Sequence, residues 1–238
     1  MRRYSRIGIA CAALLVLLAS AIYAKVDYTA ANPYSPDEFR QVRQTFRDDA
    51  ANAEARPVSD NTIYLHLPNI SPYVRRFVMD NRDNIARFDR LILDLRGNYG
   101  GQLADAYRIA DMFLADGDII GHESGRLPFL NREITAHGSR DFEFDSIIIL
   151  QNSFTASAAE SLILALTANL DNVTLVGETT FGKGTAQIIL PLRDGYSVRT
   201  TVMTLRGPNG ESIDALGIEA DIRYTGVTML DFALALAP

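Results

Sequence analysis

The chain has 238 residues, 47% of them hydrophobic and 22% charged, with a formal net charge of −6. This balance excludes an intrinsically disordered chain, and the length fits one domain with a small appendage. The negative charge argues against a nucleic-acid partner, which would require a basic face.

The first segment predicts export. Three arginines precede an uncharged apolar run at residues 7–23, and small residues at 19–21 fit a cleavage site, as in a secretory signal peptide. The run is also just long enough for an uncleaved membrane anchor, so both alternatives stay open. In either case we expect a periplasmic or otherwise extracytoplasmic protein. The only cysteine, Cys11, lies in this segment, so the mature chain would carry no thiol.

Three regions follow from these patterns. Residues 1–24 are the signal peptide or anchor, residues 25–60 are a connector with a helix, and residues 61–238 are the folded core. Within the second region, Ser35-Pro36-Asp37-Glu38 is a capping box with proline at the first helical position. It predicts a helix from Pro36 to about Ala55.

The core alternates strands with helices, and this order predicts an α/β layered domain with an attached antiparallel hairpin. Residues 117–145 show little periodicity and are predicted to be a loop, whereas Asp194-Gly195 predicts a hairpin turn. The other predicted elements are, in chain order, strand Thr62–Leu67, helix Ser71–Ile85, strand Leu91–Leu95, helix Ala104–Leu114, strand Ser146–Leu150, helix Ser161–Leu166, strands Val173–Val176, Gln187–Leu192 and Tyr196–Leu205, and helix Met229–Leu236.

Two segments at strand-to-helix junctions could carry chemistry. The Gly100-Gly101 pair precedes a helix, where backbone amides can point at an anion or an oxyanion. The stretch Thr155–Glu160 places a serine where acyl-transfer enzymes hold a nucleophile. Each has a simpler alternative, because glycines also serve tight turns and serine is an ordinary helix N-cap.

A third segment surrounds a lysine. Gly177–Lys183 matches a phosphate-binding loop in all but the last position, where Gly184 replaces the required Ser or Thr, and a β-like run follows. We therefore expect no nucleotide and no other cofactor. The three histidines are scattered, so no metal site is expected either. A buried Lys183 could instead act as the base for a serine nucleophile, with Gln187 accepting a hydrogen bond from its amine.

Together, three motifs in order resemble those of the C-terminal processing peptidases, also called tail-specific proteases. This family consists of serine endopeptidases with a Ser–Lys dyad. The resemblance runs from about Thr62 to Asp221, and its motifs are Asp94-Leu95-Arg96-Gly97-Asn98-Tyr99-Gly100-Gly101, Thr155-Ala156-Ser157-Ala158-Ala159-Glu160 and Phe181-Gly182-Lys183-Gly184-Thr185-Ala186-Gln187.

The resemblance implies a role for each matching position. Ser157 would be the nucleophile, Lys183 the general base and Gln187 the residue that orients the lysine. The oxyanion hole would combine the backbone amide of Ala158 with that of Gly100 or Gly101, of which Gly100 is the expected one. The implied fold is an α/β core of the ClpP/crotonase type.

The resemblance thus predicts an exported serine endopeptidase that cleaves proteins or peptides near their C-termini. The roughly 40 residues between the signal and Thr62 are too few for the PDZ domain that the family usually carries there. A membrane anchor or an adaptor could replace it, and the chain could form a homo-oligomer. Two alternatives stay open: a catalytically silent module that binds peptides or apolar ligands, and a hydrolase of small or cell-wall peptides.

Overall fold

The computed structural model describes residues 33–34, 36–125, 131–191 and 197–236. The predicted signal segment and the predicted turn at Asp194-Gly195 lie outside these residues. The described residues fall into two compact units. The first combines those of Met1–Phe39 with those of Ile188–Thr200, and the second combines Arg40–Gln187 with Thr201–Pro238. The candidate site lies in the second unit.

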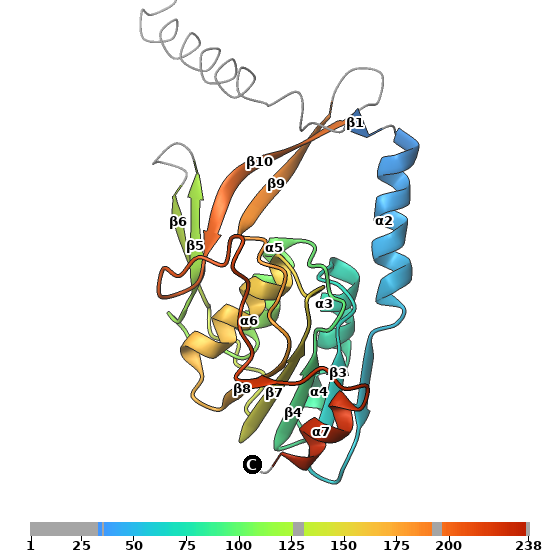
Figure 1. Cartoon of the computed structure of the whole chain (residues 1–238), viewed down its shortest axis with the longest axis vertical. Coiled ribbons are helices and arrows are strands. Elements are labelled where there is room, and N and C mark those ends of the chain that lie inside the picture. Colours follow the sequence, from blue (N-terminus) through green and yellow to red (C-terminus); the bar gives the residue numbers. More distant parts are fainter. Residues whose placement is uncertain (1–32, 35, 126–130, 192–196, 237–238) are drawn as a thin grey trace, which may run out of the picture. The chain divides into compact units, whose positions relative to one another are not determined.

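Helices and strands alternate over most of the chain, as expected (Figure 1). The helices are α2 (Pro36–Ala50), α3 (Pro72–Asp80), α4 (Arg82–Ile85), α5 (Leu103–Asp111), α6 (Ala158–Asn169) and α7 (Met229–Ala235). The strands are β1 (Pro33–Tyr34), β2 (Glu54–Pro57), β3 (Thr62–His66), β4 (Arg90–Asp94), β5 (Ile119–Gly125), β6 (Arg132–Thr135), β7 (Ser146–Gln151), β8 (Val173–Gly177), β9 (Thr185–Pro191), β10 (Ser197–Arg206) and β11 (Ile222–Arg223).

The central sheet of the second unit has the order β11-β8-β7-β4-β3-β2. Its first five strands pair in parallel, and β2 joins the edge of β3 in antiparallel fashion. Because the middle strands run in parallel, the loops after β4 and β7 leave the same edge of the sheet. These two loops carry the glycine motif and the serine motif.

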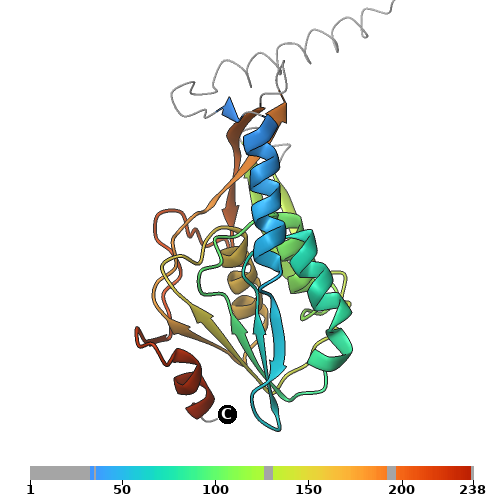
Figure 2. The same ribbon diagram turned by 90° about the vertical axis from the view of Figure 1, so that its right-hand side faces the viewer.

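Both faces of this sheet are covered, which explains why its strands are continuous apolar runs. On β3, the buried Ile63 and Leu65 pack in the main core with residues of α3, α5 and α6. The intervening Tyr64 points to the opposite face, where it packs in a smaller cluster with Met229 and Ala233 of α7. Figure 2 shows α7 and α3 on opposite sides of the sheet.

The remaining strands are antiparallel. In the second unit, the end of β10 pairs with β5, with Met203 opposite Gly125, and β5 pairs with β6. In the first unit, β1 pairs with the start of β10. The ClpP/crotonase-like α/β core with an attached antiparallel hairpin is thus confirmed by the fold and by its structural neighbours, described below. The prediction of a loop at 117–145 was wrong, because β5 and β6 lie within it.

Candidate active site

Ser157 occupies a strained turn between β7 and α6. Its backbone has φ 59° and ψ −118°, whereas an ordinary N-cap is extended. Ser71 shows the ordinary case at α3, with φ −144°, ψ 164° and its Oγ accepting from the Val74 amide at 3.3 Å. A positive φ costs a non-glycine residue about 1–3 kcal/mol, and such strain is concentrated at functional sites. The half-buried Ser157 therefore has the backbone geometry of a nucleophile elbow rather than of a simple cap.

A buried carboxylate joins this turn to the lysine segment. Glu160, the third residue of α6, is fully buried. Its Oε2 accepts from the backbone amide of Ser157 at 2.6 Å and from that of Lys183 at 2.9 Å. Its Oε1 accepts from Thr180 Oγ1 at 2.6 Å and from the Gly182 amide at 2.7 Å. The backbones of the two predicted dyad residues are thus held by a single carboxylate oxygen.

The glycines around Lys183 allow two backbones to meet. Gly182 has φ 84°, and a Cβ on it would stand 2.7 Å from the Gly217 amide nitrogen. The Gly184 amide donates to Asp214 Oδ1 at 3.1 Å. Both glycines thus have a packing reason in the structure. Gly182 and Gly184, the two neighbours of the half-buried Lys183, are therefore both held against residues 214–217.

The glycine motif lies against the Ser157 turn. Residues 97–101 contain the two glycines predicted to supply an oxyanion-binding amide, and we call them the oxyanion loop for that reason. Gly100 in this loop has φ 93°, and a Cβ on it would stand 2.6 Å from Ala156 O, 2.9 Å from Ser157 Cβ and 3.0 Å from the Ala158 nitrogen. The Gly100 amide, the expected oxyanion donor, instead donates to Asn98 Oδ1 at 2.9 Å, so the glycine that completes the oxyanion hole stays a prediction. Glycine is therefore required here by backbone conformation and by contact with the serine turn.

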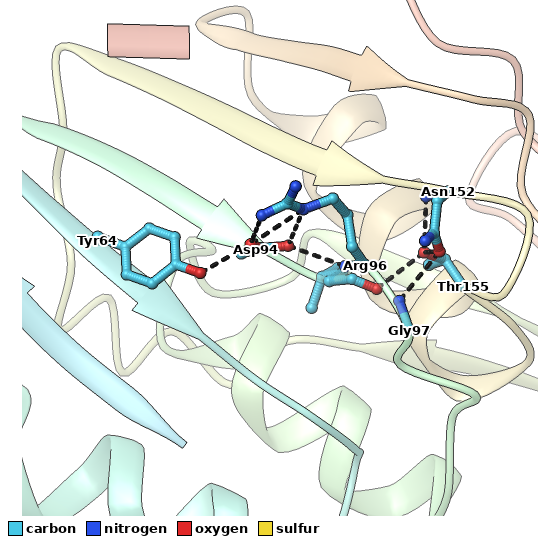
Figure 3. Close-up of polar contacts among 7 residues, drawn as sticks. Tyr64, Asp94, Arg96, Gly97, Asn152 and Thr155 are labelled. Carbon is cyan, nitrogen blue, oxygen red and sulfur yellow. Dashed lines mark hydrogen bonds and ion pairs between the residues drawn. The ribbon is translucent and has the colours of Figure 1, made fainter. Parts of the chain in front are cut away.

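The loops after β4 and β7 are joined by three further hydrogen bonds. The Gly97 amide donates to Asn152 Oδ1 at 3.0 Å, and Thr155 Oγ1 donates to Leu95 O at 2.8 Å (Figure 3). The Ala156 amide donates to Asn98 O at 2.9 Å. These bonds hold the oxyanion loop against the serine turn.

A buried ion pair supports the start of the oxyanion loop. Asp94, at the end of β4, is 2% exposed and accepts from the Arg96 guanidinium, with Nη2 to Oδ2 at 2.5 Å. Its Oδ2 also accepts from Tyr64 OH at 2.7 Å (Figure 3). Burial, followed by the charge of Asp94 and its hydrogen bond, raises the pKa of Tyr64. The hydrogen bond from Arg96 to Asp94 raises the pKa of the guanidinium.

Gln187 lies on the surface of β9. Its side chain is exposed, and its Nε2 donates to Thr201 Oγ1 of β10 at 3.3 Å. The structure thus brings Ser157, Ala158, Gly100 and the Lys183 backbone together and places the Gln187 amide on the neighbouring strand. The orienting role of Gln187 stays a prediction.

Glu160 is a buried residue of the candidate site that sequence reasoning missed. It belongs to the quoted serine motif, but no role was assigned to it. A signal was available, because Ser157 followed by Glu three positions later is a capping box. That pattern predicts only the bond back to Ser157, whereas the three bonds to residues 180–183 depend on tertiary structure.

Two features are absent from the described residues. No three His, Cys, Asp or Glu side chains in this part of the chain are close enough together to hold a metal ion. In the same part, none of the helices is both long enough and apolar enough to span a membrane.

Sequence comparison identifies relatives with a consistent description. The chain is 36% identical over 132 residues to the chloroplastic carboxyl-terminal-processing peptidase 1 of Arabidopsis thaliana, a match that covers 56% of this chain and 27% of that protein. It is 36% identical over 135 residues to the carboxy-terminal processing protease CtpA of Bacillus subtilis, covering 56% and 28%. The matches thus span less than a third of the length of these relatives.

Solved structures with a similar fold include a processing protease. A photosystem II D1 C-terminal processing protease superposes with a TM-score of 0.56 at 27% identity, covering 71% of this chain and 44% of that one. A lipoprotein from Streptococcus agalactiae has the same fold, with a TM-score of 0.65, 21% identity and coverage of 86% and 74%. The model of peptidase family S41 matches residues 61–224. The predicted relationship is confirmed, and the chain belongs to peptidase family S41, a family of serine-type peptidases.

Proposed function

We propose that this protein is an exported serine endopeptidase that cleaves proteins or peptides near their C-termini, with Ser157 as nucleophile and Lys183 as general base. The observation that carries the proposal is the shared oxygen of Glu160, which accepts from the backbone amides of both residues. The strained backbone of Ser157 and its contact with Gly100 add support. Both proposed catalytic side chains are also half-buried and thus partly accessible.

The proposed reaction proceeds through an acyl-enzyme. The neutral Lys183 amine takes the proton of Ser157 Oγ as this oxygen attacks the peptide carbonyl. The Ala158 amide and an amide of the oxyanion loop stabilise the oxyanion, and loss of one such donor costs about 100- to 1000-fold in rate. The lysine then returns the proton to the leaving amine. Water hydrolyses the ester, with Lys183 again acting as base.

Cleavage near C-termini is supported by the names of the relatives, which describe carboxyl-terminal processing. Export is supported by the sequence pattern of residues 7–23. An adaptor, a membrane anchor and further copies of the chain stay predictions from the sequence. The silent binding module is the competing proposal, and it differs from ours in predicting no turnover.

The test is cleavage of an unstructured peptide with an apolar C-terminus. We expect Ser157→Ala and Lys183→Arg each to lower kcat by at least about a thousandfold, because alanine removes the nucleophile and arginine, which stays protonated, cannot act as a base. Ser153→Ala is the matched control, since Ser153 lies exposed in the same loop and should retain activity. Unchanged turnover in Ser157→Ala or in Lys183→Arg would refute the dyad, and an inactive wild-type protein would favour the silent module.

A further inference from the structure

The second half of α2 packs on the oxyanion loop. The Phe46 ring lies 5.4 Å from the Tyr99 ring, with an angle of 53° between the ring planes. One turn further along, Asp49 Oδ2 accepts from Tyr99 OH at 2.7 Å. The Phe46 Cε1 atom would lie 3.1 Å from a Cβ placed on Gly101. These residues all belong to the second compact unit.

The same helix is also hydrogen-bonded to residues 69–70, which follow β3 and pair with the oxyanion loop. The fully buried Asn69 donates from Nδ2 to Phe46 O at 3.0 Å. The neighbouring Ile70 donates to Gly100 O at 2.9 Å and accepts from the Gln102 amide at 2.8 Å. The oxyanion loop is therefore bonded on one edge to the segment that holds α2, while Gly100 contacts Ser157.

Tyr99 is a suitable link between the helix and the loop. Its side chain is 43% exposed, so packing alone holds it only in part. Burial, followed by the hydrogen bond to Asp49, raises its pKa and keeps the phenol protonated as a donor. Hydrogen bonds to a charged acceptor are stronger than neutral ones. The two residues that flank Tyr99 in the chain, Asn98 and Gly100, are joined by a hydrogen bond from the Gly100 amide to Asn98 Oδ1.

We propose that Phe46 and Asp49 of α2 are positioning residues for the oxyanion loop, acting through Tyr99. This inference rests on the proposed peptidase function. A displacement of the oxyanion amides would weaken binding of the transition state and leave binding of the ground-state peptide nearly unchanged. The contacts of α2 therefore influence kcat, although neither residue touches the reacting atoms.

The test compares Asp49→Ala with Tyr99→Phe, which removes the same hydrogen bond from the other side. We expect each to lower kcat, and the rate of labelling by a serine-reactive phosphonate, by about tenfold to a hundredfold with KM within about twofold. The double variant should fall no further than either single variant. Asp49→Asn keeps a neutral acceptor for the phenol and should restore most of the rate. Asp48→Ala is the matched control, because Asp48 is an exposed residue of the same helix whose carboxylate accepts from Gln44.

Four results would overturn the inference: wild-type rates in Asp49→Ala, a change in KM alone, no rescue by Asp49→Asn, or additive losses in the double variant. If Asp49→Ala does not fold, Tyr99→Phe decides, since it removes one oxygen from a partly exposed side chain. An active wild-type enzyme with an unaffected Tyr99→Phe variant refutes the positioning role alone. A wild-type protein that neither cleaves nor labels refutes the proposed function, and this inference with it.

Discussion

Replacement of Glu160 by glutamine tests how the site is assembled. The carboxylate is fully buried and accepts four hydrogen bonds, two at each oxygen. Glutamine has almost the same size, but an NH2 group takes the place of one acceptor oxygen. If its remaining oxygen faces Ser157 and Lys183, its NH2 group faces the Gly182 amide and Thr180.

The expected loss follows from this geometry. Gly182 keeps an N–H group with no acceptor, and a buried donor left unsatisfied costs about 1–3 kcal/mol. The Thr180 hydroxyl can accept from the new amide but loses its own acceptor. The two bonds that persist are no longer charge-assisted, which makes them roughly half as strong. We therefore expect Glu160→Gln to lower the free energy of unfolding by about 2–5 kcal/mol.

Urea unfolding gives the change in stability, and phosphonate labelling gives the reactivity of Ser157. We expect the labelling rate to fall by about a hundredfold in protein that is still folded, because the serine turn and the lysine segment lose their shared anchor. Glu219→Gln is the matched control, since Glu219 is exposed and the same change of charge there should stay within about 0.5 kcal/mol. A Glu160→Gln variant with the stability and labelling rate of the wild type would refute this account of the site.

Two further predictions concern the oxyanion loop and a buried tyrosine. Gly100→Ala should lower kcat by about a hundredfold or more, because its Cβ would collide with Ala156 O and Ser157 Cβ. Gly117→Ala is the matched control, because Gly117 has a similar φ of 87° but meets no atom within 4 Å and lies outside the site, so equal losses of kcat in the two variants would contradict this. The pKa of Tyr107 is raised by burial first and then by Glu123, so its contribution to stability is present below about pH 10, where the unfolded phenol ionises, and is lost as the pH rises further. Tyr107→Phe should therefore flatten the alkaline fall in Tm, and an identical fall in wild type and variant would exclude this contribution.

The elements with clear apolar patterns could be predicted from the sequence. Strands β3, β4, β7 and β8 were located to within a residue or two, because strands buried on both faces are continuous apolar runs. Strand β5 was missed because it contains Gly121, His122 and Glu123. Glu123 is 4% exposed and pairs with Arg132 and Tyr107, so a charged residue points inward where the pattern requires an apolar one.

Other differences also have local causes. Helix α2 ends at Ala50 rather than near Ala55, because the chain then forms β2, an edge strand paired with β3. Edge strands carry a weak pattern, since they are mostly exposed, as β2 is.

The candidate site could be predicted as a set of residues but not as an arrangement. The motifs pointed to Ser157, Lys183 and the glycine pair, and the structure brings the backbones of these segments together. The positive φ of Ser157 could not be predicted, because an N-cap and a nucleophile elbow share the same sequence position. The bonds of Glu160 to residues 180–183 and those of α2 to Tyr99 connect distant segments, so no local pattern contains them.

The most direct test of the Ser157–Lys183 dyad is mass-spectrometric location of a serine-reactive phosphonate on the full chain. The account predicts a single adduct on Ser157 in the wild-type protein and no adduct on a folded Lys183→Arg variant. An adduct on Ser153 or another serine, equal labelling of Ser157 in Lys183→Arg, or no labelling of the wild type would contradict it.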